Sequence, residues 1–447
     1  MYRIVLLSIY NRWDEYQCRF SLSTMRLAAS VISIPNTKVT IIPIELESIH
    51  ISKTVRNVLA HKPNLVGLVA YSWLREINEK IIEQLCAQVG IVAIGGPDIM
   101  YYEKIKGYKN LKKIVGEGEN PMRMLVENMM QGKKVGETLS APYCLDYKYT
   151  PIFSNDFMSC LHGWSTSDVN YIWYNTAVGC PYKCAFCGHR LGKNCRVIDL
   201  SIIKAEIKRI GELGVGKCSI VDPVFPYPDN HDIQILRLFK EFAPDTKIEA
   251  YYRLENTTEK SVQMLVESNV SMVTIGLQTL NPGVATWIRS NDLRKAQVIL
   301  PMLSLYNIPV KLELIAGLPG DNIFSLKRTI RIVIDEYQPS ELRIYPLTVI
   351  DGTPLAKLLD NSEEETIWIR RDNKNRAFSS SSYSHSELVE MISFSMAVES
   401  LYNVYKMNGE NVTYKKIESE VMAHFSHPVF ERAMEKECQI YWKSLLK

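Results

Sequence analysis

Short apolar runs alternate with amphipathic stretches along the first third of the chain. The apolar runs lie at residues 3–8, 38–44, 65–70 and 91–94. The amphipathic stretches, with apolar residues at helical spacing, lie at 24–33, 51–59 and 77–89. Continuous apolar runs are typical of strands buried on both faces, and alternation of such strands with helices predicts a doubly wound parallel sheet. We therefore expect a Rossmann-like α/β domain over residues 1–135.

The same alternation returns after a connector, residues 136–168, in which Gly, Pro and Ser interrupt the pattern. Strand-like runs then lie at 171–179, 217–222, 247–252, 272–277, 310–315 and 341–347. Repeated strand-then-helix units predict a partial parallel barrel over 169–355, with its active site at the carboxyl ends of the strands. Residues 356–447 are predicted to be mainly helical, and the serine run 379–382 predicts a mobile loop.

Composition narrows the classes of protein. The chain has 447 residues and a formal net charge of +3, so neither a nucleic-acid footprint nor strong attraction to a membrane surface is expected. No apolar run reaches the about 18 residues of a membrane span, and the apolar N-terminus lacks a signal-peptide cleavage site. The 10 cysteines, irregularly spaced outside one triplet, do not suit a disulfide framework. We expect a cytoplasmic enzyme without nucleic-acid or membrane partners.

The triplet consists of Cys180, Cys184 and Cys187 in a C-x3-C-x2-C arrangement. Thiolates this close suit an iron–sulfur cluster, in which Cys ligands normally hold all four irons of a 4Fe–4S cube. Three ligands leave one iron open to a substrate or cofactor. Spacing alone also leaves a zinc site open, with His189 as a fourth ligand, although no second paired spacing follows.

The residues around the triplet resemble a known signature. A strand-like run, Tyr171–Gly179, precedes it, and the aromatic Phe186 stands just before its last cysteine. This unit resembles the radical S-adenosylmethionine (SAM) superfamily. The resemblance implies a 4Fe–4S cluster whose open iron binds SAM, an external electron donor, and a 5′-deoxyadenosyl radical that abstracts hydrogen from a peptide or small-molecule substrate.

Later strand ends resemble the same superfamily in the same order. The elements are Tyr252-Arg-Leu-Glu255, Gly276-Leu-Gln-Thr-Leu-Asn281 and Ala316-Gly-Leu-Pro-Gly320. Arg289 also stands in the helix expected after Gly276–Asn281, where the superfamily often has an Arg. The resemblance implies a set of cofactor-binding residues: Phe186, Asp222, Arg253, Glu255, Gln278, Arg289 and Gly317.

The N-terminal domain resembles the cobalamin-binding domain that precedes the radical domain in many radical SAM enzymes. Ser72-Trp-Leu74 matches that domain's Ser-x-Leu element, and Gly95-Gly96 matches its Gly-Gly element. The Asp-x-His-x-x-Gly that supplies the lower axial cobalt ligand is missing, and Asn-Arg-Trp-Asp-Glu-Tyr stands at 11–16 instead. The resemblance leaves two readings open: cobalamin bound without a His ligand, or a domain that kept only the fold.

Two activities are therefore expected as alternatives. The favoured one is a Cα epimerase of ribosomal-peptide maturation, in which a thiol returns hydrogen to the opposite face. Cys438 is the first choice of donor, followed by Cys160 and Cys218. The other is a cobalamin-dependent C-methyltransferase. The missing axial His favours the epimerase slightly, whereas the Ser-x-Leu and Gly-Gly elements favour the methyltransferase.

Overall fold

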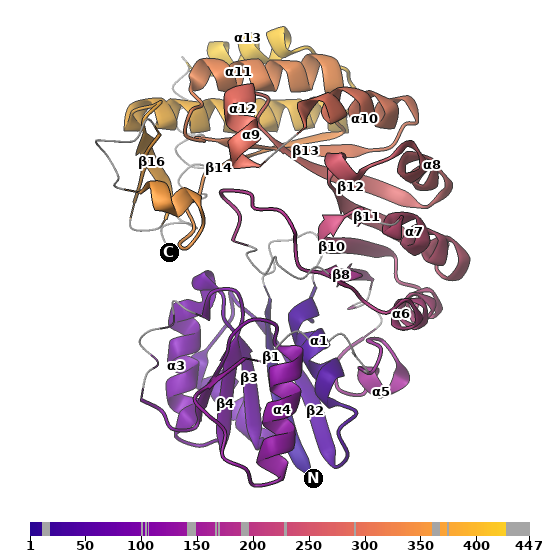
Figure 1. Ribbon diagram of the computed structural model, residues 1–447, viewed down its shortest axis with the longest axis vertical. Coiled ribbons are helices and arrows are strands. Elements are labelled where there is room, and N and C mark those ends of the chain that lie inside the picture. The colour runs from indigo at the N-terminus through magenta and orange to yellow at the C-terminus, as the bar shows by residue number, and fades with distance from the viewer. Residues whose placement is uncertain are drawn as a thin grey trace. The chain divides into compact units, whose positions relative to one another are not determined.

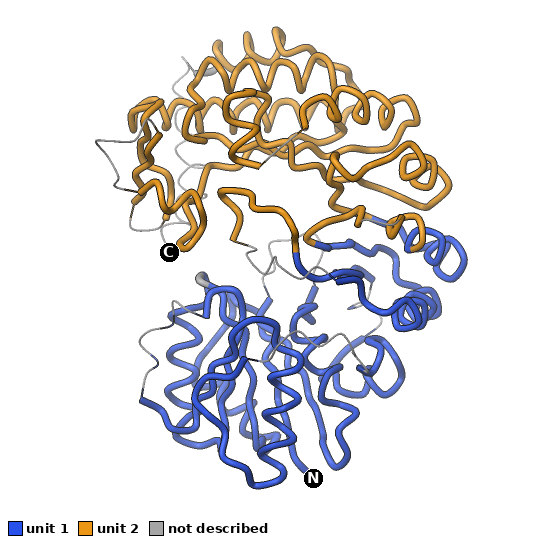
Figure 2. Tube along the Cα trace, in the orientation of Figure 1, with its two compact units in different colours: residues 1–179, 193–222, 235–248 blue, residues 180–192, 223–234, 249–447 orange. Residues whose placement is uncertain are grey.

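The computed structural model describes most of the chain. The described residues are 1–10, 18–99, 102, 105, 107–140, 149–165, 168, 170–188, 196–227, 230–289, 292–359, 367–372 and 375–425. The chain divides into two compact units built from interleaved segments (Figure 2). The first comprises Met1–Gly179, Lys193–Asp222 and Ile235–Ile248, and the second comprises Cys180–Gly192, Pro223–Gln234 and Glu249–Lys447. The predicted positions His189 and Cys438 lie outside the described residues.

The first unit contains a six-stranded parallel sheet in the order β2-β1-β3-β4-β5-β6 (Figure 1). The strands are β1 (Tyr2–Tyr10), β2 (Thr37–Glu45), β3 (Leu65–Val69), β4 (Ile91–Gly95), β5 (Leu111–Ile114) and β6 (Thr138–Leu139). The first four agree with the prediction; the last two had no clear apolar signal. The order reverses between β1 and β3, so the topological switch point, where open α/β sheets bind ligands, lies there.

Helices cover both faces of this sheet. Helices α2 (Ile51–Ala60) and α3 (Arg75–Cys86) share one apolar cluster with β1, β3 and β4. Helices α1 (Leu22–Val31) and α4 (Glu119–Met130) pack together on the opposite face, where the Leu6 and Met122 side chains both lie close to Gly67 of β3. Because both faces are covered, strands β1, β3 and β4 are mainly apolar, and the predicted doubly wound architecture is confirmed.

A second six-stranded sheet has the order β14-β13-β12-β11-β10-β7, the reverse of the chain order. Its strands are β7 (Tyr171–Tyr174), β10 (Lys217–Phe225), β11 (Lys247–Tyr252), β12 (Val270–Gln278), β13 (Val310–Ala316) and β14 (Glu341–Pro346). The helices between them are α6 (Leu200–Glu212), α7 (His231–Phe242), α8 (Glu259–Glu267), α9 (Pro282–Ile288), α10 (Leu293–Leu305) and α11 (Ile323–Ile332). This succession is the predicted series of strand–helix units. The boundary between the two units falls within β10 and β11.

Helix α12 (His385–Met407) covers the free edge of β14. The Asn403 amide accepts a 2.9 Å hydrogen bond from the Leu342 N–H and donates one of 2.9 Å to the Leu342 carbonyl. Glu399 accepts a 2.7 Å bond from the Ile344 N–H. An uncovered edge strand can pair with other chains. Here two side chains make the hydrogen bonds that a further strand would make. Helix α13 (Tyr414–Phe425) follows, within the segment predicted to be mainly helical.

The serine run is ordered, so the prediction of a mobile loop there is wrong. Its first half lies in β16 (Ala377–Ser380), which pairs with β15 (Ile369–Arg371). Ser380 is buried and donates its N–H to the Tyr383 carbonyl over 2.9 Å. The Ser382 hydroxyl accepts a 2.8 Å bond from the Gly320 N–H and donates one of 2.7 Å to the Asp321 carbonyl. Short polar side chains are used here to fix backbone rather than to solvate it.

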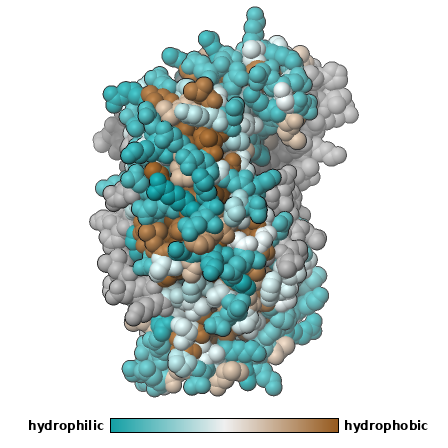
Figure 3. Space-filling model, turned by 90° about the vertical axis from the view of Figure 1, so that its right-hand side faces the viewer, coloured by the Kyte–Doolittle hydropathy of each residue, from teal (hydrophilic) through white to brown (hydrophobic). Residues whose placement is uncertain are grey.

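The surface carries both hydrophobic and hydrophilic side chains. On the face seen in Figure 3, hydrophobic side chains are interspersed among hydrophilic ones. Among the helices that the structure describes, none is long and apolar enough to cross a bilayer.

Candidate functional site

The cysteine triplet lies in a loop that follows the short strand β8 (Ala177–Val178). Cys180, Cys184 and Cys187 are all partly exposed, and none forms a disulfide. Burial raises the pKa of the Cys180 thiol, and the Cys184 and Cys187 thiols also act to raise it. The Cys184 and Cys187 thiols therefore both lie within electrostatic reach of Cys180.

This donor set fits a cube-shaped cluster. Among the described residues, no three Cys, His, Asp or Glu side chains converge as the ligands of a single metal ion would. In a 4Fe–4S cluster each thiolate binds a different iron, so the ligands surround a volume rather than a point. Zinc ligands instead share one centre. Three neighbouring thiols on one loop, none of them in a disulfide, suit such a cluster.

Backbone hydrogen bonds hold the second half of this loop in place. The Ala185 N–H donates to the Ile288 carbonyl over 2.7 Å, and the Ala185 carbonyl accepts from the Leu355 N–H over 2.9 Å. Ala185 is buried in an apolar cluster, against which the half-buried Phe186 packs. The predicted aromatic residue thus anchors the loop to the helices and turns beside it.

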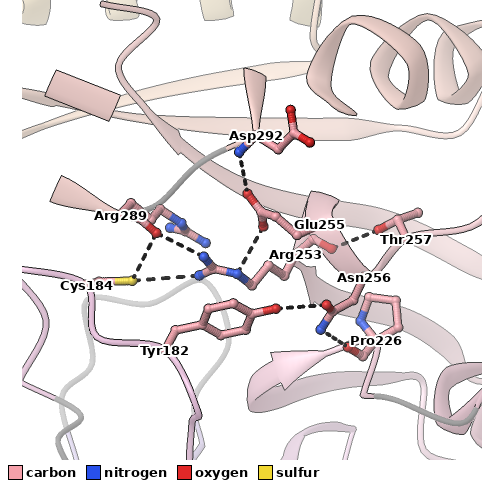
Figure 4. A network of polar contacts seen from close by, with 9 residues as sticks. All are labelled: Tyr182, Cys184, Pro226, Arg253, Glu255, Asn256, Thr257, Arg289 and Asp292. Atoms are coloured by element: carbon pink, nitrogen blue, oxygen red, sulfur yellow. Dashed lines mark hydrogen bonds and ion pairs between the residues drawn. The ribbon is translucent and has the colours of Figure 1, made fainter. Parts of the chain in front are cut away.

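Arg253, just after β11, reaches the cysteine loop (Figure 4). One terminal N–H donates to Cys184 Sγ over 3.7 Å, and the other donates to the Arg289 carbonyl over 3.0 Å. Its Nε lies 3.0 Å from a Glu255 carboxylate oxygen. The guanidinium carbon stands 3.4 Å from the centroid of the Tyr182 ring, a cation–π contact. These contacts cover the guanidinium on several sides, and Arg253 is 5% exposed.

Residues that the sequence did not single out complete this network. The Tyr182 hydroxyl donates to Asn256 Oδ1 over 2.8 Å, and the Asn256 amide donates to the Pro226 carbonyl over 2.9 Å. Glu255 accepts a 3.1 Å hydrogen bond from the Asp292 N–H. Tyr182 stands inside the triplet, so its position was the only available signal. Nothing in the sequence around Asn256 and Asp292 indicates their part in the site.

A second arginine lies on the glycine of β12. A Cβ on Gly276 would stand 2.3 Å from Arg289 Nη1 and 2.4 Å from Gln278 Nε2, so only glycine leaves room for both side chains. Gln278 ends β12 at a bulge with φ of +67°. Gly276, Arg289 and Glu255 line one small cavity. The structure thus brings the predicted residues Gln278, Arg289 and Glu255 together.

The Arg289 guanidinium is suited to an anion. Its Nε is buried and has no hydrogen-bond partner among the described residues. Burial lowers the pKa of Arg289, and the nearby Arg253 lowers it further. A guanidinium that is held away from water beside a like charge gains more from a bound carboxylate than an exposed one does.

The predicted turn Gly317–Gly320 follows β13. Gly317 has φ of +91°, a backbone conformation that favours glycine, and its carbonyl accepts a hydrogen bond from the Tyr383 hydroxyl. A Cβ at this position would also stand 2.7 Å from Leu388 Cδ1. The turn is therefore held from behind by the C-terminal segment, which sequence reasoning did not connect with it.

Asp222 contacts protein groups. Its carboxylate accepts hydrogen bonds from the Thr176 N–H over 2.6 Å, from the Ala177 N–H over 3.0 Å and from the Thr176 hydroxyl. These bonds fix the chain between β7 and β8, directly before the cysteine loop. Burial raises the pKa of Asp222 to about 6, although the three donors oppose this shift. A contact between Asp222 and SAM stays a prediction.

The Gly-Gly element of the first unit has close protein neighbours. A Cβ on Gly95 would stand 2.9 Å from Ile114 Cβ, and one on Gly96, where φ is +142°, would stand 2.7 Å from the Ala70 carbonyl oxygen. The fold therefore requires glycine at both positions, whatever else binds there. Ser72 begins the short turn Ser72–Leu74 after β3.

An exposed aromatic pair flanks Ser72. The Tyr71 and Trp73 rings stack with centroids 5.3 Å apart, and Trp73 is 55% exposed. The pair stands at the carboxyl end of β3, beside the switch point of the sheet.

Comparison with known proteins assigns the middle part of the chain to a class. Residues 174–333 match the family model described as the radical SAM superfamily, so the chain carries a radical SAM domain. A 4Fe–4S cluster and SAM are the cofactors that such a domain implies, in agreement with the sequence prediction. No curated protein sequence matches the chain.

Solved structures are similar over a longer span. One is the radical SAM methyltransferase TsrM from Kitasatospora setae with cobalamin and a 4Fe-4S cluster bound: TM-score 0.65, 14% identity, covering 83% of this chain and 78% of that one. TsrM with its tryptophan substrate and a SAM analogue gives a TM-score of 0.66 at 12% identity, with coverages of 83% and 79%. The cobalamin-dependent SAM radical enzyme OxsB, without ligands, gives 0.66 at 14%, with coverages of 97% and 72%. At these identities the similarity concerns the fold.

Proposed function

We propose that this protein is a cobalamin-dependent radical SAM enzyme that methylates a carbon atom of a peptide or small-molecule substrate. The observation that carries the proposal is the extent of the fold similarity. It spans 83% of the chain for TsrM and 97% for OxsB, and so takes in more than the radical domain alone. Fold similarity alone does not fix chemistry, so the proposal also rests on the residues of the two sites.

In the radical domain, the three cysteines would hold the cluster, and Arg289 with Gln278 would receive SAM. The buried Arg289 guanidinium, whose Nε has no hydrogen-bond partner within the described part of the chain, is the group best placed to pair with the SAM carboxylate. The turn at Gly317 would approach SAM through its backbone, because a glycine there brings no side chain. When bound, the cluster and SAM supply a 5′-deoxyadenosyl radical, for which an external donor provides the electron.

In the N-terminal domain, cobalamin would lie at the carboxyl ends of β1, β3 and β4. The switch point of the sheet lies there, and Trp73 presents an exposed aromatic face beside it. No histidine stands at residues 11–16, so the protein offers no lower axial ligand from that position. The site fits the corrin by its topology, and we assign no chemical step to a cobalt ligand.

A Cα epimerase is the second proposal. Two observations favour it: the missing histidine, and the protein contacts that already account for Gly95 and Gly96. The choice of hydrogen donor is narrowed by burial, since Cys160 is 3% exposed and Cys218 is 0% exposed. A donor must reach substrate, so of the three candidates Cys438 is left, and it lies outside the described residues.

Anaerobic protein from cells supplied with cobalamin tests both proposals. We expect the corrin absorption bands to show nearly one cobalamin per protein chain. The Trp73→Ala variant should retain less cobalamin than the control Tyr306→Ala, which replaces another exposed aromatic residue. Methylated product with S-adenosylhomocysteine would support methyl transfer. Cluster absorption without corrin, together with one deuterium gained at an inverted carbon in deuterated water, would overturn it in favour of the epimerase.

A further inference from the structure

We propose that Arg253 is a positioning residue of the iron–sulfur cluster: it holds the cysteine loop and donates a hydrogen bond to the Cys184 thiolate, instead of binding the SAM carboxylate. The resemblance to the superfamily assigned it to SAM. The proposal rests on the cluster of the radical SAM domain and is independent of whether the enzyme binds cobalamin or methylates its substrate.

The contacts of the guanidinium leave little capacity for SAM. A carboxylate is held best by two parallel N–H groups of one edge of the fork. In Arg253, Nη1 already faces Cys184 and Nη2 the Arg289 carbonyl, as Figure 4 shows. The remaining donor, Nε, lies 3.0 Å from Glu255, close enough for an ion pair, although its angle is not that of a hydrogen bond. One face of the plane is covered by the Tyr182 ring.

Arg289, which lines the small cavity beside Glu255, has different surroundings from Arg253. Neither Nε has a hydrogen-bond partner among the described residues, but the Arg253 Nε forms an ion pair with Glu255, whereas the Arg289 guanidinium lies over Gly276. Two arginines therefore stand near the cysteine loop, and we assign them different binding partners. Arg253 is neutralised by Glu255 and occupied by the loop, whereas Arg289 is available to a SAM carboxylate.

Cys184 itself indicates the direction of the interaction. Its sulfur lies 3.7 Å from Arg253 Nη1 and 3.9 Å from the Arg289 carbonyl oxygen. A thiol can donate S–H to that carbonyl, but a cluster ligand is a thiolate, which only accepts hydrogen bonds. Once the cluster is bound, the Arg253 N–H is therefore the favourable partner of this sulfur, and the contact strengthens because donor and acceptor are both charged.

The stacked ring gives the same arginine a second hold on the loop. Tyr182 lies between Cys180 and Cys184, and its hydroxyl is tied to Asn256 over 2.8 Å. A cation–π contact with a buried guanidinium restrains the ring face, while the hydrogen bond restrains its tip. Arg253 thus fixes the part of the loop that sets the spacing of the first two cluster ligands.

A measurable consequence follows for the cluster. Hydrogen bonds to cluster sulfur stabilise the more negative, reduced state and raise the reduction potential. Glu255 offsets the charge of Arg253, so most of the effect is expected from the N–H···S hydrogen bond. Removing the donor should make the cluster harder to reduce.

The experiment uses the full-length, anaerobically reconstituted protein without substrate or cobalamin. The variants are Arg253→Gln, Arg253→Lys and Tyr182→Leu, with Arg331→Gln as a control whose side chain is 70% exposed in the same unit. Iron content, the cluster potential by a redox titration followed by electron paramagnetic resonance, and the SAM dissociation constant are measured. We expect Arg253→Gln to lower the ratio of reduced to oxidised cluster about tenfold at the wild-type midpoint potential, which corresponds to a shift of about 59 mV for one electron, and to change SAM affinity by less than about twofold.

The other outcomes discriminate. A wild-type potential in a fully loaded Arg253→Gln protein overturns the proposal. So does a tenfold loss of SAM affinity at unchanged potential, which returns Arg253 to the SAM site. If the Gln variant does not hold iron, Arg253→Lys and Tyr182→Leu decide: intermediate potentials support the proposal, and wild-type potentials in both overturn it. No outcome depends on methyl transfer, because neither substrate nor cobalamin is present.

Discussion

The hydroxyl of Tyr383 donates a 2.5 Å hydrogen bond to the carbonyl of Gly317, 66 positions earlier in the chain. Tyr383 is 4% exposed, and burial raises its pKa above the ordinary value, so the hydroxyl stays protonated as a donor. The C-terminal segment therefore supports the turn Gly317–Gly320. The resemblance to the superfamily assigns this turn to the adenine side of the SAM site. The turn and its support belong to one compact unit.

Replacing Tyr383 by Phe should loosen this turn. The change removes one buried hydrogen bond and should cost about 1 kcal/mol in the free energy of unfolding. If the Gly317 turn contacts SAM, the dissociation constant for SAM should rise roughly fivefold. Calorimetric titration and denaturant unfolding measure the two effects. Tyr306→Phe, at an exposed site, is the control. Lower stability with unchanged SAM binding would assign Tyr383 a structural role only.

Replacing Cys180, Cys184 and Cys187 together by Ala should abolish both iron binding and reductive SAM cleavage. The reason is that thiolates are the cluster ligands. Cys86→Ala, at a half-buried cysteine of α3, should retain both. Iron and sulfide analysis and chromatography of 5′-deoxyadenosine give the result. SAM cleavage by the triple variant would refute the assignment of the cluster site.

The sequence predicts a strand of the sheet when burial of both faces makes that strand a continuous apolar run. Strands β1 to β4 were predicted because both of their faces are covered by helices. Strand β5 reads Leu-Lys-Lys-Ile, and its two lysines broke the apolar pattern. The serine run was misread for a related reason. Serine is common in loops, but only the fold shows that Ser382 bonds to the turn at Gly320.

The site was predictable only where its residues are close in the sequence. The three cysteines share one loop and could be found by spacing. Contacts between distant segments could not be found in this way. Arg253 and Tyr182 are 71 positions apart in the numbering, and no local pattern records the contact between them. Gly95 and Gly96 matched a family element, yet their packing against Ile114 and Ala70 became visible only in three dimensions.

Asp222 should make stability depend on pH. Burial raises its pKa to about 6, against about 3.9 in an unfolded chain. Between about pH 4 and about pH 6 the folded state therefore keeps a proton that the unfolded state has released. The free energy of unfolding should fall as the pH rises through this window, by roughly 3 kcal/mol. Asp222→Asn cannot ionise and should lack this contribution.

Urea unfolding of both proteins at several pH values measures it. The difference between wild type and Asp222→Asn should change across that window, while titrations common to both proteins cancel. One of these is His231, whose pKa burial lowers to about 4. A constant difference from about pH 4 to about pH 7 would show that folding does not raise the pKa of Asp222 above that of an ordinary carboxylate.

A buried ion pair ties the N-terminal helix α1 to the first helix of the barrel. Arg26 forms two hydrogen bonds with Glu206, of 2.7 and 3.1 Å, and the side chains are 11% and 0% exposed. Glu206 also accepts hydrogen bonds from the Tyr174 hydroxyl over 2.8 Å and from the Ile152 N–H over 2.9 Å. One carboxylate thus joins α1, the connector, β7 and α6 inside the first unit.

Removing one partner of this pair should be more harmful than removing both. Arg26→Met leaves a buried carboxylate without its counter-charge and should cost about 3–5 kcal/mol in the free energy of unfolding. Glu206→Leu conversely leaves the Arg26 guanidinium buried without its counter-charge, and a loss of similar size is expected. The double variant should lose much less than the sum, because neither charge remains unpaired. Denaturant unfolding of the four proteins gives the coupling energy.

The surface pair Arg123–Glu127, at 2.9 Å on α4, is the matched control, with an expected coupling of about 0.3–0.5 kcal/mol. Additive losses for Arg26 and Glu206 would mean that the pair is no stronger than this exposed one.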